Sequence, residues 1–394
     1  MIRANLLFFI GLLTMVYSDL WSQSSNDTQE NAHRYAIGYT DTILYDNMYP
    51  YAEYGYEGPA PLFLQVWHPI AKSTEGNYLS QEDLRSRTLP PNLEKTYKAL
   101  CEKMDSAAIW YNISRDLNGD SLQYGKDTSY FDILQLAHTA KTNGRLAPLP
   151  KVSDYPVLVY HHGAQGFSDE NIDLAEYFAS RGYIVVSSNF HLPYENMVYG
   201  SSDHDIPESL SLINTVVQFA DELSTSNPYY IGHSMGAQKG LVNMINDTLI
   251  AAFVSLETTI EFVDTSEAPN IWPFLDSVLN TQEYELNIPT LMISSTYKDE
   301  PFPYFASLAT NEMYHVIPKA GIDHESYTSA NFHRLKVATS YHCPDSSQLT
   351  EEQKTYRQIL ELIKSHFDSV RNQSALTTAP FLDNFLIHLV DQSN

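Results

Sequence analysis

The chain has 394 residues, of which 43% are hydrophobic, so it is long and apolar enough to bury a substantial core. Its 48 acidic residues against 23 basic ones give a net charge of -25. A surface this negative repels nucleic acids and anionic lipid surfaces, and we exclude both as main partners.

The N-terminal residues have the pattern of an export signal. A positive charge near the N-terminus precedes an apolar stretch, residues 6–16, that is too short to span a bilayer. We therefore expect a signal peptide over residues 1–22, a mature domain over residues 33–394, no stable membrane anchor, and a secreted or periplasmic protein. In an oxidising compartment Cys101 and Cys343 could form a disulfide bond, but the sequence leaves their pairing open.

The first predicted strands lie on either side of a loop rich in tyrosine, proline and glycine. Residues 35–45 and 61–69 are rich in β-branched and aromatic side chains, as expected for two antiparallel strands. Residues 71–154 indicate a cap-like insertion, with helical patterns around 92–104 and 130–139 but no clear strand. This segment has too few apolar residues for a core of its own, so we expect it to belong to the main domain.

From residue 155 onward the pattern becomes a regular alternation of strands and helices. The strand segments are continuous and apolar, which is typical of parallel strands buried on both faces. The predicted strands cover residues 156–160, 183–188, 229–231, 249–256, 290–294 and 314–317. The predicted helices cover residues 171–180, 207–223, 237–245, 349–370 and 380–390. The sequence therefore predicts an α/β fold with a mostly parallel central sheet and helices on both faces.

Residues 232–236, Gly-His-Ser-Met-Gly, lie between a predicted strand and a predicted helix. Strand, sharp turn and helix are the context in which a G-x-S-x-G motif exposes a nucleophilic serine. Gly232 and Gly236 let the strand and the helix pass close together, and Ser234 is then held at the C-terminal edge of the sheet. A chance match in a loop is the alternative, but the flanking strand and helix favour a nucleophile.

A serine hydroxyl is a poor nucleophile at neutral pH and needs a base to take its proton and an acid to orient that base. After this motif the order along the chain is serine, acid, histidine. His324 lies in a loop directly after the last predicted strand, whereas His315 lies within that strand. Position therefore favours His324 as the general base.

Two carboxylates are candidates for the acid. Glu257 stands directly at the end of a predicted strand, where the backbone is well fixed, whereas Asp299 lies several residues beyond the next strand. We favour Glu257 and keep Asp299 as the alternative.

Backbone amides supply the expected oxyanion hole. The amide of Met235 lies at the start of the helix after the serine, and the amide of Ala164 lies in the glycine-rich loop after strand 156–160. His161 and His162 in that loop are adjacent, so they point to opposite sides of a strand, and no third ligand has a fitting spacing. We interpret them as structural histidines and expect no metal ion.

Taken together, these motifs resemble the α/β-hydrolase superfamily. Within it, the chain resembles the plasma-type platelet-activating-factor acetylhydrolases and the dienelactone-hydrolase-like exported proteins over residues 35–332, apart from the insertion. The resemblance rests on the His-Gly loop with residues 172–186, on the serine motif, and on residues 324–327 (His-Glu-Ser-Tyr). Glu257 stands where the acetylhydrolases carry an aspartate, and their use of this earlier position supports its assignment as the acid.

The sequence thus predicts a secreted serine hydrolase that cleaves a small-molecule or lipid-like carboxylic ester through an acyl-enzyme, without a cofactor. Two alternatives stay open. One is an exported serine peptidase of the same fold, and the other is a non-catalytic binding protein on a hydrolase scaffold.

Overall fold

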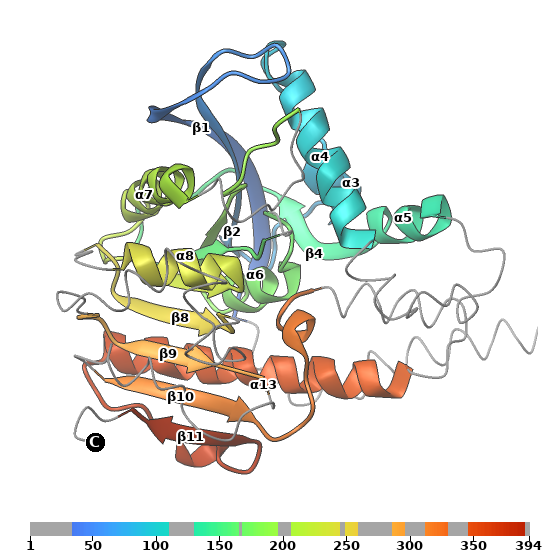
Figure 1. The fold of residues 1–394 in the computed structure, drawn as a ribbon. Coiled ribbons are helices and arrows are strands. Elements are labelled where there is room, and N and C mark those ends of the chain that lie inside the picture. The colour runs from blue at the N-terminus through green and yellow to red at the C-terminus, as the bar shows by residue number, and fades with distance from the viewer. Residues whose placement is uncertain are drawn as a thin grey trace, which may run out of the picture.

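The computed structural model describes residues 34–109, 130–164, 168–195, 206–244, 249–258, 286–295, 312–329 and 346–390 (Figure 1). The predicted signal peptide, residues 1–22, lies outside this set. Among the described residues, no helix is both long and apolar enough to cross a membrane.

Eleven strands of the described chain form one sheet at the centre of the molecule. Their bounds are β1 (Ala36–Tyr51), β2 (Gly58–Ile70), β3 (Tyr78–Ser80), β4 (Lys141–Leu146), β5 (Val157–His161), β6 (Ile184–Ser187), β7 (Tyr229–His233), β8 (Ala252–Leu256), β9 (Thr290–Ile293), β10 (Met313–Pro318) and β11 (Phe385–Leu389). From edge to edge their order is β11-β10-β9-β8-β7-β5-β6-β2-β1-β4-β3. The strands from β10 to β6 in this order are all parallel, which confirms the predicted sheet.

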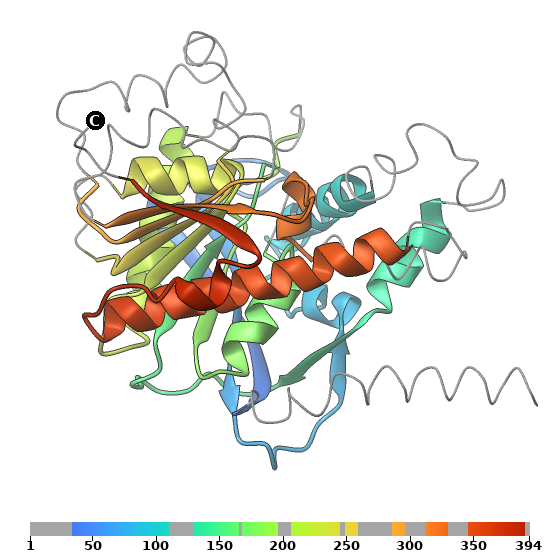
Figure 2. The ribbon, with the colours of Figure 1, turned by 90° about the horizontal axis from the view of Figure 1, so that it is seen from below.

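Helices cover both faces of this sheet (Figure 2). On one face lie α4 (Glu94–Ile109), α7 (Ile206–Asp221) and α8 (Met235–Asn243), and on the other lie α6 (Ile172–Ala179) and α13 (Ser346–Arg371). Successive residues of a strand point to opposite faces, so Tyr230 of β7 joins the first core while Tyr229 and Ile231 join the second. The continuous apolar strands are therefore buried on both sides.

The insertion, residues 71–154, contains two strands where the sequence predicts none. β3 and β4 extend the sheet beyond β1. In the chain they are separated by α3 (Gln81–Arg85), α4 and α5 (Tyr130–His138). β4 has the sequence Lys-Thr-Asn-Gly-Arg-Leu and no apolar run, because its inward positions are Thr142 and Gly144. A Cβ at Gly144 would lie 2.5 Å from the ring of Trp67, so glycine lets this strand pack against a bulky side chain.

The predicted helix at residues 380–390 is also wrong. A 3-10 turn, η4 (Ala379–Phe381), leads into β11, which pairs antiparallel with β10. A short apolar run fits either a helix or a strand, and here the open edge of β10 offers backbone partners. Phe385 is buried in the second core, which fixes the register of the pairing.

Candidate active site

Ser234 lies in the sharp turn between β7 and α8. Its backbone has φ 52° and ψ -119°, a conformation that residues other than glycine rarely adopt. A Cβ on Gly232 would collide with the backbone of Gly236 and Ala237, and one on Gly236 would collide with the carbonyl groups of His161 and His162. These two glycines allow the tight turn that places Ser234 at the C-terminal end of β7, as the sequence predicts.

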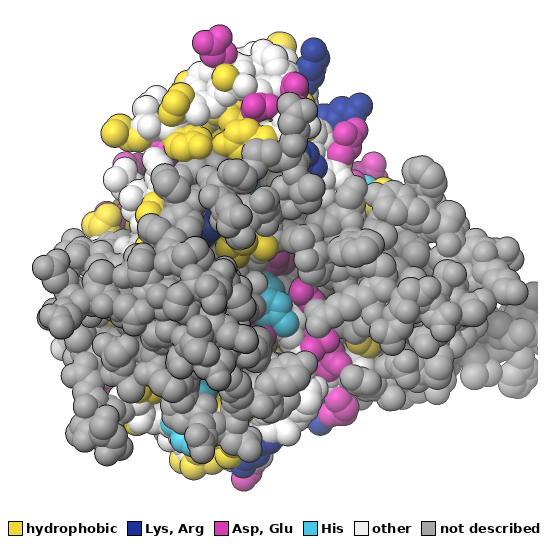
Figure 3. Space-filling model, viewed as in Figure 1, with side chains coloured by type: hydrophobic (Ala, Val, Ile, Leu, Met, Phe, Trp, Pro, Cys, Tyr) yellow, Lys and Arg dark blue, Asp and Glu magenta, His cyan; other side chains and the backbone are white. Residues whose placement is uncertain are grey.

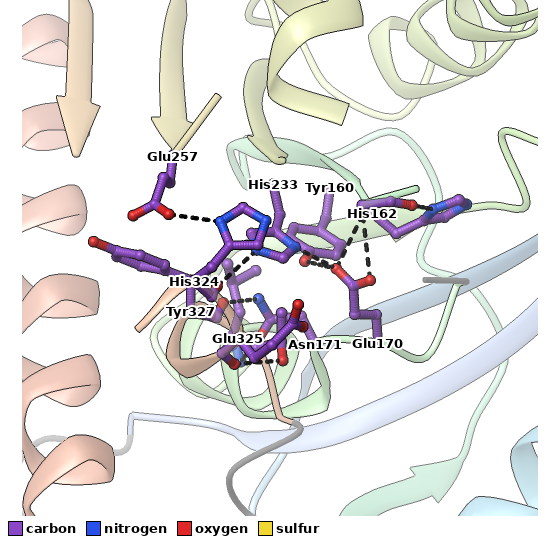
Figure 4. A network of polar contacts seen from close by, with 12 residues as sticks. Tyr160, His162, Glu170, Asn171, His233, Glu257, His324, Glu325 and Tyr327 are labelled. Atoms are coloured by element: carbon purple, nitrogen blue, oxygen red, sulfur yellow. Dashed lines mark hydrogen bonds and ion pairs between the residues drawn. The ribbon is translucent and has the colours of Figure 1, made fainter. Parts of the chain in front are cut away.

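His324 and Glu257 form a hydrogen-bonded pair (Figure 4). His324 begins the 3-10 turn η3 (His324–Tyr327) after β10, and its Nδ1 lies 2.7 Å from Oε1 of Glu257. Because Nδ1–H donates a hydrogen bond to the carboxylate, the proton of the neutral ring stays on Nδ1, and Nε2 keeps its lone pair and can act as a base.

The Glu257 carboxylate is fully buried at the end of β8 and both of its oxygens have partners. Oε2 accepts a hydrogen bond of 2.6 Å from the amide of Ser295, and the backbone amide of Glu257 donates to the carbonyl of Ile293. These contacts hold the carboxylate in one orientation toward His324. The alternative acid, Asp299, lies outside the described residues.

Two further contacts hold the Glu257–His324 pair beside the turn that carries Ser234. The amide of Ser234 donates a hydrogen bond of 3.2 Å to the carbonyl of Leu256, the residue before Glu257. Nε2 of His233, the residue before Ser234, lies 3.0 Å from the carbonyl oxygen of His324. Three segments that are distant in sequence therefore meet at the C-terminal edge of the sheet.

The loop after β5 lies against this turn. A Cβ on Gly163 would stand 3.3 Å from Cβ of Ser234 and 3.0 Å from Nδ1 of His233, so the loop passes directly beside the serine. Ala164 follows Gly163 and is half-buried, and Met235 is the first residue of α8. Amides in the first turn of a helix have no partner within the helix and can donate to an anion.

A buried network around Glu170 was missed in the sequence. The Glu170 carboxylate accepts hydrogen bonds from the hydroxyl of Tyr160 at 2.6 Å and from the amide of Gly163 at 3.2 Å, and its Oε1 lies 3.1 Å from Nδ1 of His233 (Figure 4). Burial alone would lower the pKa of His233, but Glu170, Glu325 and the carbonyl of His324 raise it to about 9. The one feature of the sequence that points to this network is His233, the second residue of the serine motif.

His161 and His162 are fully buried, as expected for structural histidines. Nδ1 of His161 lies 2.5 Å from the hydroxyl of Tyr230, while His162 donates from Nδ1 to the carbonyl of Gly163 and accepts at Nε2 from the amide of Phe190. Burial lowers the pKa of His162 to about 4. In the described part of the chain, no group of three or more histidine, cysteine or acidic residues could hold a metal ion.

The insertion is tied to the loop beside the serine. The Arg85 guanidinium of α3 donates from Nε to Asp169 at 2.7 Å and also contacts Asp105 of α4. Asp169 directly precedes Glu170, so this ion pair links the insertion to the network around Glu170 and His233. Cys101 of α4 is half-buried, and Cys343 lies outside the described residues, so their pairing stays open.

No protein-family model and no curated protein matches the chain. Among solved structures, a ferulic acid esterase from Streptomyces cinnamoneus superposes with a TM-score of 0.50 at 16% sequence identity, covering 87% of this chain and 93% of that one. The chain has the α/β-hydrolase fold. The predicted fold class is thereby confirmed. Est1E from Butyrivibrio proteoclasticus, determined with ferulic acid bound, matches 42% of this chain and 80% of that one with a TM-score of 0.32 at 15% identity.

Histidine and acidic side chains reach the surface together near the centre of one face of the molecule (Figure 3). The side chain of His324 is 18% exposed, whereas that of Glu257 is 0% exposed. The base can thus be reached from solvent while its carboxylate partner is shielded.

Proposed function

We propose that the protein is an exported serine hydrolase that cleaves carboxylic esters through an acyl-enzyme on Ser234. In this proposal His324 is the general base, Glu257 orients it, and the amides of Met235 and Ala164 form the oxyanion hole. The observation that carries the proposal is the 2.7 Å contact between the buried Glu257 carboxylate and His324, beside a strained serine turn on an α/β-hydrolase fold.

The reaction begins when Oγ of Ser234 attacks the ester carbonyl carbon while Nε2 of His324 takes the hydroxyl proton. The carbonyl electron pair moves onto oxygen, and the two backbone amides donate hydrogen bonds to that oxyanion. When the tetrahedral intermediate collapses, the bond to the alcohol oxygen breaks, and His324 gives its proton to the departing alcohol. A water molecule then repeats the sequence on the acyl-enzyme and releases the acid.

The Glu257 carboxylate has two tasks in this scheme. It holds the imidazole in the tautomer whose Nε2 is unprotonated, and it stabilises the imidazolium that forms after proton transfer. Its burial strengthens both effects, because the interaction between the charges is screened less in the interior than in water.

The proposed substrate is a small-molecule or lipid-like ester. Two observations support this class: the acetylhydrolase-like motifs in the sequence, and the fold shared with an enzyme described as a ferulic acid esterase. We therefore include aliphatic acyl esters of graded length and hydroxycinnamate esters among the compounds to be tested.

The purified protein is to be assayed against p-nitrophenyl esters, methyl ferulate and peptide anilides, with Ser234→Ala as the matched control. We expect hydrolysis of one or more esters and a loss of order 10^4-fold in Ser234→Ala, because the oxyanion hole alone retains little activity. Cleavage of anilides without esters would indicate a peptidase instead. A wild-type protein that a fluorophosphonate probe does not label would indicate a non-catalytic binding protein.

A further inference from the structure

The side chain of His233 bridges two parts of the site that the mechanism requires to be fixed. Its Nδ1 lies 3.1 Å from Oε1 of Glu170, and its Nε2 lies 3.0 Å from the backbone oxygen of His324. His233 and Glu170 are both nearly inaccessible, with side-chain exposures of 3% and 11%. The bridge therefore lies between the loop beside Ser234 and the turn that carries the general base.

The partners of His233 determine its protonation state. A backbone carbonyl oxygen can only accept a hydrogen bond, and an ionised carboxylate can only accept one as well. Both ring nitrogens of His233 must therefore donate, which requires the doubly protonated imidazolium. Two further donors favour the ionised form of Glu170: the hydroxyl of Tyr160, which donates to Oε1, and the amide of Gly163, which lies 3.2 Å from both carboxylate oxygens.

We propose that Glu170 and His233 form a buried ion pair that positions the proposed catalytic groups, and that His233 must carry its second proton for full activity. Glu170 fixes the amide of Gly163 and so the backbone that leads to Ala164. His233 fixes the carbonyl of His324 and so the distance between base and nucleophile. This inference rests on the proposed function of Ser234 and His324.

The charged and titratable groups around His233 come from several segments. Glu170 precedes α6, while Glu325, the His324 ring at 4.7 Å and the Tyr327 ring at 6.5 Å belong to η3. His162, after β5, is kept neutral by its own burial. Burial of His233 opposes the charged form, but the two carboxylates and the His324 carbonyl outweigh it, and the pKa of His233 rises to about 9.

The proposal predicts an alkaline limit to activity. Above about pH 9, His233 loses a proton and can no longer donate to both Glu170 and the His324 carbonyl. On the acid side, activity falls separately because a protonated His324 cannot act as a base. The wild-type profile should thus be a bell whose alkaline limb belongs to His233.

The test is the pH dependence of kcat and of the rate of fluorophosphonate labelling, measured for the wild type and for Glu170→Gln. In Glu170→Gln the pKa of His233 should fall toward or below its ordinary value of about 6.5, because burial now dominates. The alkaline limb should move to lower pH by the same amount. At neutral pH we expect kcat to fall by about 10–100-fold with KM nearly unchanged, since misplacement of catalytic groups has effects of this size.

Two further variants separate positioning from loss of stability. Asp169→Asn removes the neighbouring buried carboxylate, which pairs with Arg85 and not with His233, so it should destabilise the protein while its alkaline limb stays near pH 9. His233→Gln removes the titrating group, so its kcat should be low and its alkaline limb absent. This variant keeps the test valid if Glu170→Gln does not fold.

The inference is overturned if the wild type hydrolyses esters but either variant that folds, Glu170→Gln or His233→Gln, retains full kcat and an unmoved alkaline limb. That outcome would leave the proposed function intact. A wild type that folds but is neither labelled at Ser234 nor active on esters would overturn the proposed function, and the positioning role with it.

Discussion

Two residues of the proposed triad have unusual backbone conformations. Ser234 and Glu257 have φ values of 52° and 59°, and the only other described non-glycine residues with positive φ are Tyr54 and Gln373. Such conformations cost of order 1–3 kcal/mol and persist where the surroundings enforce them. At Glu257, the hydrogen bonds of its amide to Ile293 and of its carboxylate to Ser295 supply that enforcement.

The identity of the acid can be tested by replacing each carboxylate with its amide. A glutamine at 257 has one acceptor atom, so it cannot accept from both the Ser295 amide and Nδ1 of His324, and its own NH2 group would oppose one of them. We expect Glu257→Gln to reduce kcat by roughly 10^4-fold, as for other triads with a wrong tautomer. Asp299→Asn should keep most of the activity.

Steady-state kinetics on one p-nitrophenyl ester, with circular dichroism to verify folding, would decide between the two carboxylates. If Asp299→Asn lost most of its kcat while Glu257→Gln kept it, the acid would be Asp299, after β9, rather than Glu257, after β8.

The sequence indicated the serine turn and the histidine because their local patterns are strong, but it missed the pair Glu170–His233. A strand, a glycine pair and a helix start are visible within a few residues around Ser234. Glu170 gains its importance only because the fold brings its carboxylate to His233, 63 positions later in the chain, and to the amide of Gly163. The spacing of these residues along the sequence does not predict that they are in contact.

At the level of elements, the insertion is anchored by buried charges rather than by apolar contacts alone. Arg85 has a side-chain exposure of 7% and Asp169 of 0%, and the two are joined through Nε and Nη2 of the guanidinium. His138 of α5 also contacts Asp105, so α3, α4 and α5 share one polar cluster. This cluster connects the insertion to the loop beside Ser234.

Removal of Arg85 should therefore destabilise the whole domain. Arg85→Ala leaves the Asp169 charge buried without its partner, a change that typically costs about 3–5 kcal/mol. Lys98→Ala, which breaks an exposed pair with Glu102 on α4, should cost less than about 1 kcal/mol. Urea unfolding at neutral pH measures both values, and equal effects of the two substitutions would argue against the anchoring role of Arg85.

Element types were predictable where apolar patterns dominate and not where backbone pairing dominates. The buried strands β5 to β10 have continuous apolar runs, and the sequence identified all of them. β4 is polar and joins the sheet through the backbone edge of β1, while β11 has an apolar run that fits a helix equally well. In both cases the deciding partner is an open strand edge far away in the sequence.

For the whole molecule, the order of the strands explains why the site lies where it does. The parallel strands β5, β7 and β8 are neighbours, so the loops that follow them, with Gly163, Ser234 and Glu257, meet at one edge of the sheet. β10 lies two strands beyond β8 in the sheet (Figure 1). The turn η3, which follows β10, returns to this edge, and there His324 contacts Glu257. Alternation of strand and helix predicted this fold class, whereas the role of the insertion as a cap over the site stays a prediction.

The proposed acyl-enzyme on Ser234 can be trapped by rapid quenching and located by mass spectrometry. The wild type is mixed with excess p-nitrophenyl butyrate, quenched in acid within the first turnover, and measured as the intact protein and as peptides. We expect one added butyryl group per molecule, located on Ser234, and none in Ser234→Ala. Rapid ester hydrolysis with an unmodified Ser234, or with the acyl group on another residue, would contradict it.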